Sequence, residues 1–217
     1  MIDERRGQRH RAATLDHILW GGANLDTALD TLEELTGVRA TYGGQHPDLG
    51  THNAVAALGP KTFIEVIAPD PKLKAGALAH RLQKLPAPTL LMWAATTPSA
   101  TQTAAHATAE GYEATVAEGH RPRPDGAVVR WTNVFVSGHG AGILVPFFIQ
   151  WATASHPASE APSDLRLKAF HAETPQPAAL KAVLEALDVK LAVRKGNVAR
   201  LVAVLDTPRG LVTLTST

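Results

Sequence analysis

Two ionisable residues, His17 and Glu65, interrupt otherwise apolar stretches of this sequence, and their types are suited to chemistry. Glu65 stands in the segment FIEVI, whose other residues are apolar on both faces of a strand, so its carboxylate is expected to be buried. A buried carboxylate needs a charged partner, a metal ion or several hydrogen bonds, because its pKa otherwise rises until the group is neutral. A histidine and a carboxylate together could hold a divalent metal or move a proton. The structural alternative, in which each only satisfies hydrogen bonds in the core, stays open.

The two residues lie on the first and last strands of a segment, residues 14–69, whose pattern predicts the element order βαβββ. Strict alternation along the first strand puts His17 on one face and Asp16 on the other. A helix with leucines at helical spacing follows, with Asn24 as its N-cap and Gly37 after its last turn. The segment is therefore one α+β module that holds His17 and Glu65 on its outer strands.

The same order of elements is predicted twice more along the chain. Residues 89–151 form the second module, and together with the first they span a two-module unit, residues 14–151. A turn-rich linker precedes a third βαβββ-like module, residues 164–217. The first 13 residues are polar with alternating charges and are expected to form a flexible arm.

The second and third modules lack a matching His–Glu pair. In the second module, the matching positions offer Leu91 or Met92 on the first strand and Phe147, Phe148 or Gln150 on the last. The third module has Ala169 at the position of His17, and His171 lies two residues further on the same face. A complete pair is thus expected in the first module alone, with at most one further histidine from the third.

Several motifs make the chain resemble the glyoxalase-like branch of the vicinal oxygen chelate superfamily, which includes bleomycin-resistance proteins and dioxygenases. They are LDHILWGGANLDTALDTLEELTGV, the loop and strand GGQHPDLGTHNA, FIEVIAPDP, and the later WTNVF and VPFFIQW. The resemblance covers nearly the whole chain after the arm. It implies an α+β fold in which repeated βαβββ modules form curved mixed sheets with helices on the convex face, so that paired modules make a cup.

The resemblance also implies a metal site. In the metalloenzymes of this superfamily, the outer strands of paired modules supply His or Glu ligands to one divalent metal, and His17 and Glu65 fall on those strands. They are candidate ligands for manganese, iron, nickel or zinc, or else a catalytic base and its partner. A catalytic metal usually takes three or more protein ligands. The third would come from His171, His52 or His46, and without it a metal-free cup is the alternative.

Six further residues are candidates for binding a substrate in the cup: His46, His52, Arg123, Trp131, Phe148 and Gln150. The two histidines flank the QHPDLGTH loop. Arg123, with Arg121 in the loop HRPRPDG, could clamp a carboxylate through paired hydrogen bonds. Trp131 and Phe148 could wall an apolar pocket. Gln150 replaces an acid that the family pattern would place there, which weakens a case for acid–base chemistry at that position.

Composition narrows the classes of function. The formal net charge is +1 and there is no cysteine. We therefore expect no nucleic-acid partner and no thiol chemistry. No apolar run is long enough to span a membrane and the start does not read as a secretory signal, so a cytoplasmic location without a membrane partner is expected. Motifs of serine hydrolases, phosphate-binding loops and dinucleotide sites do not occur.

Two functions from different classes follow. In the first, the protein binds a small oxygenated metabolite in the cup and acts as a metal-assisted lyase, isomerase or dioxygenase. In the second, it is a metal-free protein that binds or sequesters a small apolar molecule, in the manner of bleomycin-resistance proteins. Whether the chain is an enzyme stays open. A third module without a partner also needs a cover, which either the same cup or a second chain in a homodimer would supply.

Overall fold

The computed structural model describes residues 12–123, 125–153 and 155–216. The expected flexible arm lies outside the described residues except for its last two, and of these Ala13 pairs with Val189 in an isolated parallel bridge. Among the helices that the structure describes, none is long and apolar enough to cross a membrane.

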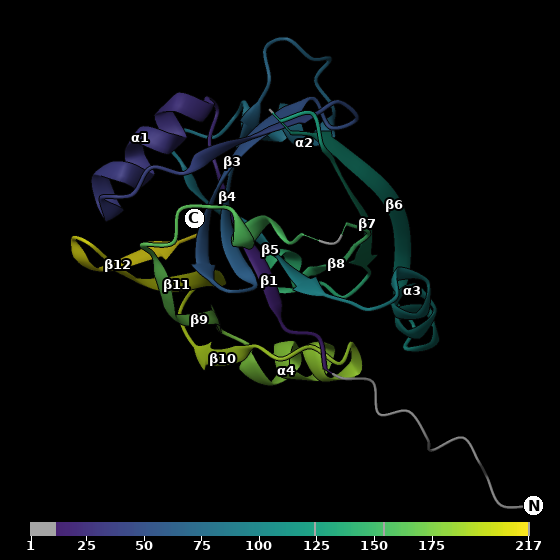
Figure 1. The fold of residues 1–217 in the computed structure, drawn as a ribbon. Helices are drawn as coiled ribbons and strands as arrows, with labels where there is room; N and C mark the ends of the chain where they lie inside the picture. Colours follow the sequence, from purple (N-terminus) through teal and green to yellow (C-terminus); the bar gives the residue numbers. More distant parts are fainter. Residues whose placement is uncertain (1–11, 124, 154, 217) are drawn as a thin grey trace, which may run out of the picture.

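Eight strands form one mixed sheet in the order β2-β3-β4-β1-β5-β8-β7-β6, which curls into a half-barrel (Figure 1). The strands are β1 (Leu15–Gly21), β2 (Thr41–His46), β3 (Thr51–Gly59), β4 (Thr62–Pro69), β5 (Thr89–Thr96), β6 (Glu113–Pro122), β7 (Val128–Ser137) and β8 (Phe147–Trp151). In each half the first strand pairs in parallel with the last, β1 with β4 and β5 with β8. Antiparallel pairing of β1 with β5 joins the halves. The predicted α+β fold with a curved mixed sheet is confirmed.

The helices follow from their caps and apolar stripes. In α1 (Leu25–Thr36), the Asn24 side chain accepts a hydrogen bond from the backbone of Thr27, and Gly37 ends the helix at φ 79°. With α3 (Ala100–Ala109), α1 covers the convex face of the sheet. The short α2 (Ala77–Leu82) lies on the concave side, where Leu82 packs with Leu19. One end of the cup is thus closed by α2.

The strand β6 continues further than its sequence predicts. The segment HRPRPDG reads as a loop, yet β6 pairs with β7 through Pro122, which faces Val128. A proline fits there because β6 is an edge strand, so its missing N–H leaves no ladder bond unmade. Arg121 is therefore held on a strand, and it is buried where β6 approaches the other edge strand, β2.

The last part of the chain forms a second sheet, in the order β10-β9-β11-β12. Its elements are β9 (Arg166–Thr174), α4 (Pro177–Ala186), β10 (Ala192–Lys195), β11 (Arg200–Thr207) and β12 (Gly210–Thr215), preceded by the 3-10 turns η2 (Gly142–Leu144) and η3 (Pro157–Ser159). The element order is βαβββ, but β9 pairs in parallel with β10, its second strand, whereas β1 and β5 pair with their fourth. The apolar face of this sheet packs against the convex face of the large one, with Phe170 edge-on to Trp93. The same chain thus covers the third unit.

Candidate functional site

The concave face of the large sheet encloses a cavity with an empty volume of about 620 Å³, open solvent at its mouth included. Its lining is mainly apolar and aromatic, with the following polar side chains among it: His17, His46, Asn53, Glu65, Arg121 and Asn133. Phe63 stacks on the His17 ring with centroids 4.5 Å apart. Trp131 and Trp151 lie edge-to-face at 5.9 Å. A small ligand with an apolar body and a few polar groups suits such a cavity.

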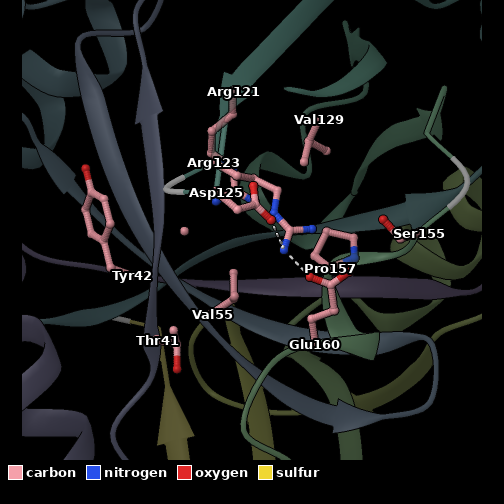
Figure 2. A pocket seen from close by; sticks show the side chains of 11 residues that line it. Thr41, Tyr42, Val55, Arg121, Arg123, Asp125, Val129, Ser155, Pro157 and Glu160 are labelled. Carbon is pink, nitrogen blue, oxygen red and sulfur yellow. Dashed lines mark hydrogen bonds and ion pairs between the residues drawn. The ribbon is translucent and has the colours of Figure 1, made fainter. Parts of the chain in front are cut away.

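A second hollow, the outer hollow, adjoins this inner cavity at the rim of the cup (Figure 2). Its empty volume is about 700 Å³, open solvent included. Three of its residues, Val55, Arg121 and Pro157, also line the inner cavity. Arg121 therefore lies at the junction of the two spaces.

A β-bulge at Asp16 corrects the strict alternation expected for β1. The pairing with β5 shifts between Leu15 and His17, so Asp16 is the extra residue. The sequence predicts Asp16 on the face opposite His17. The bulge instead turns the carboxylate of Asp16 toward the side chains of His17 and Trp151. The carboxylate of Asp16 is completely buried and contacts the ring of the very next residue. The sequence did not identify Asp16 as a site residue, because no residue pattern marks the bulge.

Asp16 fixes the orientation and the tautomer of His17. Its Oδ1 lies 2.7 Å from His17 Nδ1, and its Oδ2 accepts from Trp151 Nε1 at 3.0 Å and lies 3.2 Å from His156 Nε2. Burial raises the pKa of Asp16, but the hydrogen bonds of His156 and His17 outweigh burial and lower the pKa to about 2. An ionised carboxylate only accepts hydrogen bonds, so His17 must carry a proton on Nδ1. A neutral His17 therefore presents an unprotonated Nε2.

Glu65 faces that unprotonated nitrogen, with 3.7 Å between His17 Nε2 and Glu65 Oε2. The other oxygen of Glu65, Oε1, accepts from Asn53 Nδ2 at 2.6 Å. Arg121 donates to Asn53 Oδ1 at 3.1 Å, and because a guanidinium only donates, this bond fixes which way the amide points. A polar row thus runs along the cup from Asp16 to Arg121.

His46 lies at the other side of Glu65, with its Nε2 3.8 Å from Glu65 Oε1 and its Nδ1 3.0 Å from Thr51 Oγ1. Its ring stands edge-on to Trp131. Burial lowers the pKa of His46 to about 4, against the opposing effect of the Glu65 charge. His46 is therefore a neutral side chain at neutral pH, suited to contact a ligand rather than to carry charge.

Of the sequence candidates, the structure brings His17, His46, Glu65 and Trp131 together in the cavity. It places Phe148 and Gln150 on the convex face, because alternation along β8 turns Phe147, Ile149 and Trp151 inward instead. Gln150 accepts from the backbone N–H of Ala100 at the start of α3, a local structural contact.

Three other candidates also lie away from the cavity. His52 occupies the convex face of β3, 3.7 Å from Asp70, and the small residues Ala54 and Ala56 beyond it pack in the core with α1. His171 belongs to the second sheet, where Glu173 and Arg194 are its neighbours. Arg123 lines only the outer hollow and pairs with Asp125 and Glu160, as the dashed lines in Figure 2 mark.

The donors of the cup do not fit a resident metal. No three His, Asp or Glu side chains are grouped to hold an ion within residues 12–123, 125–153 and 155–216. His17 and His46 face different oxygens of Glu65, and Asn53 already binds one of those oxygens. Of the three candidates for the third ligand, His171 is in the other sheet and His52 lies beside Asp70, so only His46 joins His17 and Glu65 in the cavity. The second half of the cup adds only apolar side chains at the matching strands, such as Met92 and Ile149.

We expect protein purified without an affinity tag to contain well below one divalent metal per chain, because His17, His46 and Glu65 in the cup are not grouped to hold such an ion. Equimolar manganese, iron, nickel or zinc should leave the midpoint of thermal unfolding unchanged. Plasma mass spectrometry and calorimetry measure both quantities. About one ion per chain, lost in both His17→Ala and Glu65→Ala, would contradict this reading of the site.

Comparison with known proteins identifies the family of this chain and structures with a similar fold. A family model described as a glyoxalase-like domain matches residues 15–187. No curated protein matches the sequence. A hypothetical protein from Staphylococcus aureus has a TM-score of 0.67 at 13% identity, over 86% of this chain and 88% of that chain. A mutant of 4-hydroxymandelate synthase from Streptomyces coelicolor has a TM-score of 0.50 at 14% identity, over 95% of this chain and 63% of that chain. Methylmalonyl-CoA epimerase from Mycobacterium tuberculosis reaches 0.49 at 19% identity, over 69% and 95% respectively.

Proposed function

Because the chain belongs to the glyoxalase-like domain family, we propose that its cup binds a small oxygenated metabolite and moves a proton on it. In this proposal His17 is the base, Asp16 orients it, and Glu65 is the second group that accepts or returns the proton. The reaction class would be an isomerisation or elimination next to a carbonyl group. The family and the fold do not fix the reaction, so the side chains of the site carry the proposal.

The observation that carries it is the pair of facing acceptors at the floor of the cavity. Asp16 holds the proton of His17 on Nδ1, so neither Nε2 nor an ionised Glu65 has a hydrogen to offer the other across 3.7 Å. A ligand whose acidic C–H or O–H approaches this pair from the cavity would supply the hydrogen that both lack. The apolar walls exclude water and strengthen the interactions of such a ligand with the two groups.

The chemistry at these two groups is a proton relay. Nε2 of His17 takes a proton from the carbon beside the carbonyl group, and Asp16 stabilises the imidazolium that forms. The electron pair left behind is delocalised onto the carbonyl oxygen as an enolate. Return of the proton to the same or the neighbouring carbon, from His17 or by way of Glu65, completes an isomerisation.

Deuterium exchange tests this function without knowledge of the natural substrate. Small 2-oxo and 2-hydroxy acids, together with neutral ketones, are incubated with the protein in D2O, and proton NMR measures the exchange of the hydrogen beside the carbonyl. We expect exchange in at least one compound, and a loss of about 100-fold or more in His17→Asn, since a positioned base typically contributes this much. His120→Asn is the matched control, because His120 is half-exposed on β6 outside the cavity. Equal exchange in wild type and His17→Asn would contradict the proposal.

Two observations favour a second candidate, a protein that only binds or sequesters its ligand. The cavity is lined mostly by apolar and aromatic side chains, and its donors do not make up a metal site. Tight binding of a compound that shows no exchange and no other turnover would support this candidate over the first.

A cytoplasmic location and a homodimer stay proposals for this protein. The second sheet is covered by its own chain, so the open face that motivates a dimer is already packed. The molar mass measured by light scattering decides between one chain and two.

A further inference from the structure

We propose that Arg121 binds the carboxylate of a monovalent organic acid whose apolar body fills the aromatic cup, so that the ligand of the proposed function is an oxo or hydroxy acid. This inference rests on the proposed function and narrows its substrate class. Four features of Arg121 support it: its buried charge without a paired anion, the space made for it, the charges around it and its position.

The first feature is a buried cation without a paired anion. Arg121 is only 5% exposed, and within the described residues no carboxylate lies at ion-pair distance from it. Its one hydrogen bond in that part of the chain goes to the amide of Asn53, although a guanidinium has five N–H donors. A buried charge is costly unless it is paired and hydrogen-bonded. Burial accordingly lowers the pKa of Arg121, and the distant charge of Glu65 offsets this only in part.

The second feature is a space kept open for the guanidinium. A Cβ at position 43 would overlap Nη1 of Arg121, and one at position 44 would approach Arg121 Cγ to 3.0 Å. Both glycines lie in β2 at a shift in its pairing with β3. Two adjacent glycines thus let the edge strand pass directly beside the side chain, which holds Arg121 in one place.

The charges around Arg121 favour a single negative charge. Its neighbour Arg123 is already paired with Asp125 and Glu160, so among the described residues that line this rim Arg121 is the cation left without an acidic partner. A phosphate dianion would bring two charges against one arginine, close to the carboxylate of Glu65. A carboxylate matches the guanidinium in charge and can accept two parallel hydrogen bonds.

The position of Arg121 also suits an acid that reacts at His17. Arg121 lines the inner cavity as well as the outer hollow, and Asn53 and Glu65 connect it to His17 along one wall. A ligand held by its carboxylate at Arg121 would extend its apolar part over the wall formed by Phe63 and Trp151. The hydrogen beside its carbonyl group would then come near His17.

Probes with and without the charge test this inference. Phenylacetate and 3-phenylpropionate are compared with their amides and with phenyl phosphate, and binding is measured by the fluorescence of Trp131 and Trp151, which line the cavity. We expect wild-type protein to bind at least one acid about tenfold or more tightly than its amide, as a charge-assisted paired hydrogen bond provides. Arg121→Gln should remove this preference and leave the affinity for the amides unchanged. Arg123→Gln, the matched control, should keep it.

Gly43→Ala is a second variant that displaces the guanidinium without changing Arg121, and it should also lose the preference for acids. The thermal midpoint of Arg121→Gln should stay the same or rise, because a buried unpaired charge is removed. Three outcomes would overturn the inference: no preference of the wild type for either acid, a preference that survives in Arg121→Gln, or tighter binding of phenyl phosphate than of both acids. A lower midpoint with unchanged ligand preference would assign Arg121 a structural role and overturn it as well.

The two proposals fail separately. A preference for acids in a protein that exchanges no hydrogen refutes the base at His17 and leaves the carboxylate site standing. Exchange on neutral ketones, lost in His17→Asn but accompanied by no preference for acids, refutes only the carboxylate site.

Discussion

Replacement of Asp16 by Asn is expected to lower the free energy of unfolding by about 3 kcal/mol, because it breaks a buried charge network. Asp16 is fully buried and accepts from Trp151 Nε1, and the ring nitrogens of His17 and His156 lie within 3.2 Å of it. An Asn side chain has one oxygen, and its NH2 group would face at least one of these donors. Urea unfolding at pH 7 measures the difference. Asp206→Asn is the control, because Asp206 forms a half-exposed ion pair with Lys168. This substitution should change the free energy of unfolding by less than about 1 kcal/mol.

The same residue predicts how stability changes in acid. The pKa of Asp16 is about 2 in the folded protein, below its ordinary value of 3.8, so the folded state holds its proton less well than the unfolded chain. The contribution of Asp16 is complete above about pH 4 and is lost as the pH falls toward 2, by about 2 kcal/mol in total. Asp16→Asn should lack this part of the acid dependence. A variant that keeps the wild-type slope below pH 4 would show that Asp16 is not the titrating group.

A fall in pH from 7 to 4 is expected to destabilise the protein through His46, by about 3 kcal/mol. Burial lowers the pKa of His46 from 6.5 to about 4, so the unfolded chain takes up a proton on this residue before the folded protein does. Stability therefore decreases as the pH falls through this window, and the contribution of His46 levels off below pH 4. The window lies above that of Asp16, so the two effects are separable.

Unfolding free energies at pH 7, 6, 5 and 4 test this prediction in wild type, His46→Gln and His120→Gln. The first variant should lose most of the slope between pH 6.5 and 4, because it removes the buried titrating ring. The second should keep it, because the His120 side chain is 41% exposed. An equal slope in wild type and His46→Gln would mean that His46 takes up its proton in the folded state.

Residue types and periodicity were sufficient to predict the order of the elements and two polar residues of the large sheet, whereas the curved sheet was expected from the family resemblance. The positions of His17 and Glu65 on the first and last strands of the module followed from alternation and apolar flanks, because β1 and β4 pair in an unbroken register from His17 to Gly21. Alternation along β8 also points Phe147, and not Phe148, into the cup once the register of β8 is known. Sequence alone left that register open by one residue, and a shift of one residue reverses the face of every side chain.

The rest of the site depends on irregular backbone and long-range pairing. No residue pattern marks the bulge that turns Asp16 toward His17. The extension of β6 that buries Arg121 runs through Pro122, a residue that usually predicts the end of a strand. His171 was a candidate ligand because its module repeats the order βαβββ. That order is compatible with two strand pairings, and the observed pairing puts His171 in a separate sheet. Tertiary contacts decided each of these points.

The tautomer of His17 decides whether the proposed base exists, because only a bare Nε2 can take up the proton of a ligand. Nitrogen-15 NMR of histidine-labelled protein at pH 8, with the His17 signals assigned by their loss in His17→Asn, reports which ring nitrogen carries the proton. The hydrogen bond from Nδ1 to the Asp16 carboxylate predicts a protonated Nδ1 and a bare Nε2 that faces Glu65. A proton on Nε2 would leave no base at the floor of the cavity and would contradict the proposed function.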